Sequence, residues 1–313
     1  MPEMISHGNM PSVSVVIATR NRGAQILPTL RSILDGAVRD IEVLVIDQSD
    51  NDLTAQALRN LEGSARVRYV RDTCKGLSRA RNLGLSLVHA PLVAITDDDC
   101  IPPRNWLALL LGYFEGDVPA DIVFSAVEAP TLNYRKAIVP VFHPTHERVE
   151  HGLSGCAGRL EGIGANLAFR RDVVRRLGGF NPWFGAGGPR WSGEDRELHY
   201  RALRDGACVY VVREPAVLHV GIRASAEKWA LWKRDALGAG AISAYIIRQG
   251  SPLTALRFWW WHIGRIVQAA LLRTLFLRFP VGIKLAGWMV WHSLRGCAIE
   301  WRHPGPLYPP SDT

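Results

Sequence analysis

Short apolar runs alternate with amphipathic segments along the first 126 residues, and the two patterns predict two kinds of element. Runs of β-branched and other aliphatic residues are typical of strands that are buried on both faces. They cover residues 13–18, 41–46, 67–70, 92–96 and 122–126. Apolar residues recur at helical spacing in residues 24–34, 53–61, 77–88 and 106–114. This alternation predicts an α/β fold with a doubly wound, mostly parallel sheet, in which ligands bind beyond the carboxyl ends of the strands.

The pattern is less regular from residue 128 to residue 219. Residues 128–155 are rich in Pro and His and predict a loop. A second loop, rich in Gly and aromatic residues, is predicted at 181–193, directly before a helix over 194–204. The other predicted elements are an extended segment at 161–170, a short helix at 171–177 and strands at 208–212 and 216–219.

The last 90 or so residues read as helices. We expect three of them, over residues 225–248, 252–279 and 280–301, and no uncharged run reaches the roughly 18 residues that a membrane span needs. In the second helix one side is apolar, whereas Arg257, Arg265 and Gln268 share the other side. The apolar side consists of Leu256, Trp259, Trp260, Ile263, Val267 and Leu271.

Charge and tryptophan divide the chain near Gly221. Residues 1–222 carry 25 basic and 25 acidic residues, whereas residues 223–313 carry 12 and 4, together with 8 of the 11 Trp. Arg and Trp together on amphipathic helices suit a membrane interface. A helical cap that packs on the rest of the protein, or an oligomer contact, is the alternative. Because the basic residues are interleaved with Trp and Leu instead of forming a polar stripe, the composition argues against a nucleic-acid-binding module.

Cysteine usage and the N-terminus bear on the compartment. The five Cys are odd in number and widely spaced, which indicates neither a disulfide framework nor a zinc site and favours a reducing compartment. Residues 1–10 lack the charged start and apolar core of a signal peptide. We therefore expect a cytoplasmic protein, peripheral on the cytoplasmic face of the membrane.

Polar clusters follow three of the predicted strands, at the edge where ligands are expected. Asp97, Asp98 and Asp99 follow the strand at 92–96, and three adjacent carboxylates are most stable when a cation compensates their repulsion. Oxygen ligands suit Mg²⁺ or Mn²⁺, although an acidic solvated loop or a helix N-terminus is the alternative. Asp47 either binds a nucleoside or caps the following helix. The third cluster is Thr19, Arg20, Asn21 and Arg22.

Three further groups each have a functional and a structural interpretation. Glu194 and Asp195 open a helix, where they either complement its dipole or supply a general base. His219 follows a predicted strand and is either structural or a ligand for a metal or a diphosphate. Trp183 and Trp191 either stack on a sugar or pack in the interior.

In their order and spacing, these segments resemble the family 2 glycosyltransferases, which have the glycosyltransferase A fold. The resemblance covers roughly residues 11–222. It rests on residues 12–22 (SVSVVIATRNR), 43–50 (VLVIDQSD), 76–84 (GLSRARNLG), 96–100 (TDDDC), 164–171 (GANLAFRR) and 193–195 (GED). Many members read Asp-Asp-Gly-Ser where this chain has Asp47-Gln48-Ser49-Asp50.

The resemblance implies a role for each group. On the donor side, Thr19, Arg20, Asn21, Arg22 and Asp47 would bind the nucleotide, with Arg81, Asp97 and Asp98. A divalent ion, Mn²⁺ or Mg²⁺, would be held by Asp99 with Asp97 and His219. Asp195 would be the catalytic base, with Glu194 beside it. The acceptor would meet Gly164, Ala165, Asn166, Trp183 and Trp191.

The expected enzyme moves a sugar from a nucleotide-diphosphate sugar, a UDP-sugar being favoured, to a hydroxyl of a saccharide or lipid-linked acceptor with inversion of configuration. We expect a flexible N-terminus (1–10), a catalytic domain (11–222), an amphipathic helical extension (223–303) and a Pro-rich tail (304–313). The alternatives are a sugar-phosphate nucleotidyltransferase, which would usually show a Gly-rich phosphate loop after the first strand, and an inactive, basic membrane-bound scaffold.

Overall fold

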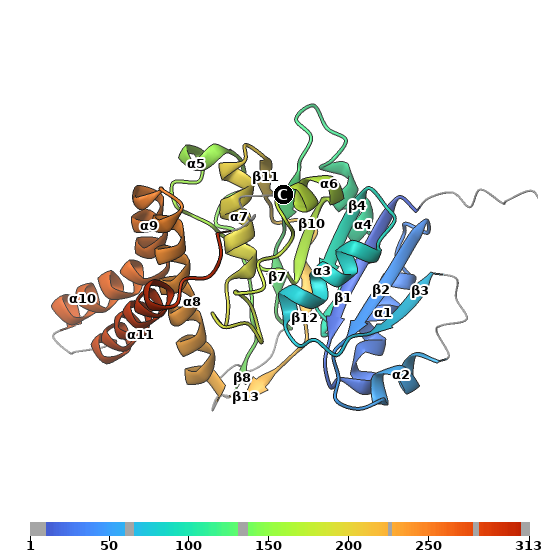
Figure 1. The fold of residues 1–313 in the computed structure, drawn as a ribbon, viewed down its shortest axis with the longest axis horizontal. Helices are drawn as coiled ribbons and strands as arrows, with labels where there is room; N and C mark the ends of the chain where they lie inside the picture. The colour runs from blue at the N-terminus through green and yellow to red at the C-terminus, as the bar shows by residue number, and fades with distance from the viewer. Residues whose placement is uncertain (1–10, 60–65, 131–136, 225–226, 278–281, 308–313) are drawn as a thin grey trace, which may run out of the picture.

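The computed structural model describes residues 11–59, 66–130, 137–224, 227–277 and 282–307. An eight-stranded sheet in the order β3-β2-β1-β4-β10-β6-β11-β9 forms its centre (Figure 1). The strands are β1 (Val13–Thr19), β2 (Ile41–Asp47), β3 (Val67–Arg71), β4 (Leu92–Thr96), β6 (Ile122–Phe124), β9 (Arg148–His151), β10 (Asn166–Arg170) and β11 (Cys208–Val211).

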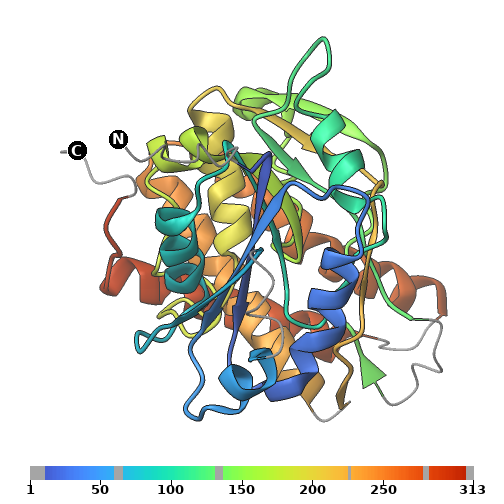
Figure 2. The same cartoon turned by 90° about the vertical axis from the view of Figure 1, so that its right-hand side faces the viewer.

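Strands β3, β2, β1 and β4 are parallel and carry helices on both faces, which confirms the predicted α/β architecture. Val16 and Leu44 face one apolar cluster with α3 (Leu77–Leu87), whereas Val15 and Val43 face a second cluster on the other side. Figure 2 shows α1 and α3 on opposite faces of the sheet. The helices of the second face are α1 (Leu27–Leu34) and α4 (Trp106–Gly112), and α1 continues the 3₁₀ turn η1 (Gly23–Ile26). Helix α2 (Leu53–Leu58) lies between β2 and β3 in sequence.

The other half of the sheet is mixed. Strand β10 is antiparallel to both β4 and β6, and β9 is an antiparallel edge strand on β11. The prediction of a loop over 128–155 was therefore wrong for the strand at 148–151, and also for a short strand at 137–138 and a helical turn at 152–155. Only one residue of this edge strand is buried, so no apolar run marks it in the sequence. Short helices α5 (Gly152–Gly155) and α6 (Arg171–Arg176) and the longer α7 (Glu194–Arg204) complete this part.

Two small sheets lie beside the central one. The first joins β12 (Val217–His219) to β5 (Cys100–Ile101) and β7 (Val127–Glu128). The second pairs β8 (Ala137–Ile138) with β13 (Arg223–Ala224). The first matters for function because it brings His219 directly opposite Cys100.

The C-terminal helices gather at the end of the molecule opposite β3 and α2 (Figure 1). They are α8 (Lys228–Arg248), α9 (Pro252–Trp259), α10 (Arg265–Leu277) and α11 (Ile283–Arg302). The single helix predicted for 252–279 is interrupted by a π-helical turn, η3 (Trp260–Gly264), which rotates the side chains beyond it relative to a continuous α-helix. Among the described helices, none combines the length and apolarity needed to cross a membrane.

Several predicted boundaries lie outside the described residues. They are the flexible N-terminus (1–10), the end of the helix at 53–61, the start of the helix at Ser225, the junction at Phe279 and Pro280, and the last part of the Pro-rich tail.

Helices α8 and α11 are in close contact because glycines replace side chains where they meet. A Cβ on Gly240 would lie 1.8 Å from the carbonyl oxygen of Ser293, and one on Gly296 would lie 2.0 Å from that of Leu237. Backbone therefore packs against backbone, and any side chain at these positions has to push the helices apart.

We predict that Gly240→Ala lowers the melting temperature, whereas Gly287→Ala does not. Overpacking of this kind costs typically about 1–3 kcal/mol. The matched position Gly287 lies in α11 with nothing within 4 Å of a Cβ, so alanine there gains helix propensity worth roughly 1 kcal/mol. Thermal unfolding of the two single variants measures the difference, and equal melting temperatures would contradict the close helix contact.

Candidate active site

The three adjacent carboxylates lie where β4 ends, and they do not all face the same way. Asp98 turns back toward β1, where its Oδ2 accepts a hydrogen bond of 2.6 Å from the Thr19 hydroxyl and its carbonyl accepts one of 3.0 Å from the Thr29 hydroxyl. Burial, with added repulsion from its two neighbours, raises the pKa of Asp98 to about 6. The Asp97 side chain is the most accessible of the three, at 35% exposed.

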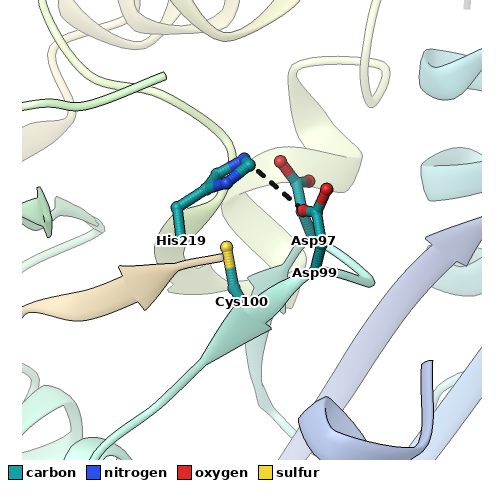
Figure 3. Close-up of side chains that lie close together, drawn as sticks. All are labelled: Asp97, Asp99, Cys100 and His219. Carbon is teal, nitrogen blue, oxygen red and sulfur yellow. Dashed lines mark ion pairs between the residues drawn. The ribbon is translucent and has the colours of Figure 1, made fainter. Parts of the chain in front are cut away.

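Asp97, Asp99, Cys100 and His219 bring their ligand atoms together, all within 4.8 Å of one another (Figure 3). The pairing of β12 with β5 delivers His219, whose Nε2 lies 3.4 Å from Asp99 Oδ1. A Cβ on Gly221 would lie 2.1 Å from Asp99 Oδ2, so this close approach requires glycine. Two carboxylates, an imidazole and a thiol are a chemically suitable donor set for a divalent cation.

Cys100 was not predicted as part of the site. The signal is present in the sequence, because Cys100 directly follows the three Asp, but the wide spacing of the five Cys indicates neither a zinc site nor a disulfide framework. Burial and the neighbouring carboxylates raise the pKa of the Cys100 thiol far above its usual range.

A cavity of about 280 Å³ opens beside these groups. Its basic residues are Arg20 and Arg22, and Arg22 forms ion pairs with Asp99 Oδ2 at 2.6 Å and Asp98 Oδ1 at 3.2 Å. The wall is completed by Ala18, Thr19, Gln48, Gly76, Leu77, Asp97, Asp98, Asp99, Ala186, Gly187 and His219. The cavity thus combines cationic side chains with the group that could hold a cation, as a diphosphate would require.

Two predicted nucleotide contacts have other partners in the structure. The Asp47 side chain has no exposed surface, and its oxygens accept hydrogen bonds of 2.9 Å from the Ser49 backbone N–H and the Tyr69 hydroxyl. Asn21 joins its loop to the next one, since its Oδ1 accepts a 2.8 Å hydrogen bond from the backbone N–H of Asp50. Gln48, the residue after Asp47, lies in the cavity wall instead.

Arg81 connects the cavity with the pair Glu194 and Asp195. Its side chain is 2% exposed, and it donates a 2.9 Å hydrogen bond to Glu194 Oε1 while lying 3.5 Å from Asp97 Oδ1. Gly164 packs directly on the guanidinium, because a Cβ there would lie 2.3 Å from it. One buried cation therefore balances a carboxylate on each side of the site.

Asp195 is held by backbone groups at the start of α7. Its Oδ2 accepts a 3.1 Å hydrogen bond from the Gly164 N–H, and its Oδ1 accepts one of 2.8 Å from the Arg196 N–H. Burial, with added repulsion from the adjacent Glu194, raises the pKa of Asp195 to about 6. The carboxylate is thus ionised at neutral pH and close to the range in which a general base works well.

The predicted acceptor residues divide into two groups. Gly164 touches both Arg81 and Asp195, as described. Ala165 and Asn166 are buried, and Asn166 binds the Trp106 indole at 2.9 Å and the carbonyls of Ala126 and Pro215. Their observed contacts are with the protein interior.

Contacts with the C-terminal helices support the loop before α7. Arg190, 2% exposed, stacks over Trp183 with 5.0 Å to the ring centroid and donates a 2.7 Å hydrogen bond to Glu300 of α11. Arg248 of α8 binds the other oxygen of Glu300. Trp191 has a positive φ of 63°, and the Arg234 side chain binds its carbonyl. Because Arg190 and Glu300 are 110 residues apart in sequence, no local pattern reveals their contact.

Similarity to known proteins agrees with this geometry. The sequence profile of the family described as Glycosyl transferase family 2 matches residues 14–178, more than half of the chain. The chain is also 30% identical over 242 residues to validoxylamine A glucosyltransferase of Streptomyces hygroscopicus subsp. jinggangensis, a match that covers 68% of this chain. The chain belongs to glycosyltransferase family 2.

Other members of the family extend beyond this chain. The match covers 56% of the validoxylamine A glucosyltransferase named above and 52% of the one from the subspecies limoneus, so the chain spans just over half of their length. Chondroitin synthase of Escherichia coli is 27% identical over 226 residues, which are 62% of this chain and 32% of the synthase.

Solved structures show the same fold. The mannosyltransferase PcManGT of Pyrobaculum calidifontis, solved in complex with GDP-Man and Mn²⁺, superposes with a TM-score of 0.62 at 18% identity over 94% of this chain and 87% of its own. TarS of S. aureus (residues 1–349) gives a TM-score of 0.55 at 17% identity over 73% and 64% of the two chains. The chain therefore has a glycosyltransferase A fold.

Proposed function

We propose that this glycosyltransferase transfers a sugar from a nucleotide-diphosphate sugar to a hydroxyl of a saccharide or lipid-linked acceptor and inverts the anomeric configuration. The observation that carries the proposal is the convergence of two groups from distant parts of the chain. Asp97, Asp99 and His219 meet at the cavity, and Asp195 lies on the other side of Arg81. The first group suits a diphosphate leaving group, and the second suits an attacking hydroxyl.

On the donor side, Arg20, Arg22 and Thr19 would bind the nucleotide diphosphate, and Asp99, Asp97 and His219 would hold Mn²⁺ or Mg²⁺. A divalent cation in this position stabilises negative charge on a departing diphosphate. Arg81 and Asp98 would act indirectly, by fixing the carboxylates and the loop that carries Thr19. Asp47 would act in the same way through its contacts with Ser49 and Tyr69.

Gln48 supports a uridine nucleotide as the donor. Its Nε2 donates to Asp72 Oδ2 at 2.7 Å and to carbonyls of the loop 74–76, and its Oε1 accepts a 2.8 Å hydrogen bond from the Gly76 N–H. Because the amide protons of Gln48 are used in hydrogen bonds to this loop, its side chain can bind a ligand in the cavity through the amide oxygen, which accepts a hydrogen bond. Uracil offers a ring N–H that such an acceptor can bind, as guanine does, whereas adenine and cytosine in nucleotides have no ring N–H.

Asp195 would be the general base. It takes the proton of the acceptor hydroxyl, whose oxygen forms a bond to the anomeric carbon as the bond from that carbon to the diphosphate breaks. The nucleoside diphosphate leaves from the opposite face, so the configuration inverts. Position and fixed charge supply most of the acceleration in such a displacement.

We propose that the enzyme acts at an anionic membrane surface, on the cytoplasmic face. Its proposed role is in the synthesis of bacterial cell-surface polysaccharide or glycolipid. Leu253, Leu256 and Trp260 lie along the outer side of α9 and η3 and are 58%, 64% and 50% exposed. An apolar groove of about 330 Å³ is lined by Leu256 and Trp260 together with Arg257 and Trp261. Arg257, Arg265 and the excess positive charge of residues 223–313 complement anionic lipid.

We predict that one donor in a panel of nucleotide sugars releases a nucleoside diphosphate in the presence of Mn²⁺. Asp99→Ala should reduce this release about a hundredfold or more, because the departing diphosphate loses its counter-ion. The exposed Asp117 is the matched control, and Asp117→Ala should retain activity. Product chromatography measures both variants.

The same assay distinguishes the rival functions. Release of pyrophosphate instead of a nucleoside diphosphate would assign a nucleotidyltransferase. Failure to bind any donor under every metal condition, with and without acceptor lipid, would favour an inactive scaffold.

We predict that kcat/KM falls as the pH decreases through about 6, the raised pKa of Asp195. The base works only when ionised, so the rate at pH 5 should be about a tenth of the plateau and should level off above pH 7. Asp195→Asn should lose this acid limb together with most of the activity. A pH–rate profile at saturating metal checks this, and a flat profile down to pH 5 would contradict the assignment of Asp195.

We predict that the protein co-floats with vesicles of phosphatidylglycerol and phosphatidylcholine, and that Leu256→Ser with Trp260→Ser weakens binding at least about tenfold, since two large apolar side chains contribute roughly 1.5–3 kcal/mol each when fully buried. Leu109→Ser with Val118→Ser is the matched control, because these side chains are also exposed but lie outside the C-terminal helices. Equal flotation of the two double variants would contradict the proposed lipid-facing surface.

A further inference from the structure

A thiol is part of the group that could hold a cation. Cys100 opens β5 and lies directly opposite His219 in the pairing of β5 with β12, so the two side chains are neighbours on the same face. Figure 3 shows the sulfur pointing toward the imidazole and the two carboxylates. Its distance to each of their ligand atoms is at most 4.8 Å.

The position of the sulfur relative to the cavity is as important as its distance. Cys100 has no exposed surface and packs in the apolar cluster that contains Val127 and Val217. Asp97 and Asp99, in contrast, line the cavity. His219 lines the cavity as well, so an ion that enters from the cavity meets the carboxylate oxygens and the imidazole first and has the thiol on its inner side.

Hard and soft cations use such a set differently. Mn²⁺ and Mg²⁺ prefer oxygen and do not need the thiol, whereas Zn²⁺, Co²⁺ and Cd²⁺ bind sulfur and nitrogen readily. Four protein ligands around Zn²⁺ form a closed site, whereas a working site keeps a position open for substrate. The same residues thus permit two coordination modes with opposite consequences for the donor.

We propose that this site has a second, closed mode of metal binding, in which Cys100 Sγ completes a four-ligand set with Asp97, Asp99 and His219 around a thiophilic divalent ion such as Zn²⁺, Co²⁺ or Cd²⁺. The thiol releases its proton as the sulfur–metal bond forms. With four protein ligands, the bound ion has no open coordination position for a diphosphate. Thiophilic ions therefore inhibit the transferase in competition with Mn²⁺. The inference rests on the proposed function only in treating Asp97, Asp99 and His219 as metal ligands.

The chain contains an internal comparison for this proposal. Cys208 is also a buried thiol beside an imidazole, with its Sγ 3.6 Å from His151 Nε2. In the described part of the chain, it does not belong to a group of three or more ligand residues, whereas Cys100 does. Cys208→Ser therefore controls for a thiol–imidazole pair that is not part of such a ligand group.

The test is a titration with Co²⁺, whose bond to a thiolate gives a charge-transfer band in the near ultraviolet. This band is measured in the wild type and in the Cys100→Ser and Cys208→Ser variants. The band should saturate at one equivalent in the wild type and in Cys208→Ser and be absent in Cys100→Ser. The affinity for Zn²⁺ should fall about tenfold or more in Cys100→Ser, while that for Mn²⁺, measured by electron paramagnetic resonance, stays within about twofold.

Retained Mn²⁺ binding also shows that the variant is folded, and Cys100→Ala provides a second substitution if serine is not tolerated in the core. Displacement of Mn²⁺ by Co²⁺ without the band, or a band that persists in Cys100→Ser, would overturn the closed mode and leave the proposed function intact. Absence of binding for both ions in the wild type would remove the metal site and both proposals with it.

Discussion

Repulsion among the carboxylates at the end of β4 is the constraint on which the rest of the structure depends. Three successive Asp side chains at a strand end need compensating partners, and the fold supplies each from a different element. Arg22 comes from the loop after β1, Arg81 from α3 and His219 from β12. Sequence-distant segments are therefore tied to one point. The cavity walls follow from the same requirement, because the compensating groups line or flank the cavity.

The second half of the site depends on the same cations. Arg81 is shared between Asp97 and Glu194, which brings the start of α7 to the cavity. Among the described residues, Asp195 forms no ion pair with a guanidinium group and is held by backbone N–H groups instead. Buried, and bound in the described part of the chain by two backbone N–H groups, Asp195 keeps a raised pKa. Glu194 and Asp195 are adjacent in sequence, yet one is neutralised and the other is available to accept a proton.

How far the sequence predicts this structure depends on whether the signal is local. The parallel strands β1, β2 and β4 were predicted correctly because burial on both faces leaves continuous apolar runs. The edge strand β9 leaves none, and the π-helical turn η3 is a break in hydrogen bonding that helical spacing does not reveal. Among site residues, the cluster at Asp97 was visible as a motif. The burial of Asp47, the participation of Cys100 and the contact of Arg190 with Glu300 depend on pairings between distant segments.

The C-terminal helices have two faces with different partners. Ala255, Phe258 and Ile263 are buried in the core cluster shared with α7 and α8, whereas Leu253, Leu256 and Trp260 are exposed. Glu300 belongs to the inward side and fixes Arg190, so the loop before the proposed base is held by the same helices that carry the proposed lipid-facing surface. A membrane bound to the outer face would thus be connected through α11 to the acceptor side of the site. This arrangement suits an acceptor that reaches the enzyme from a lipid surface, because binding to the surface and positioning of the loop then involve one rigid group of helices.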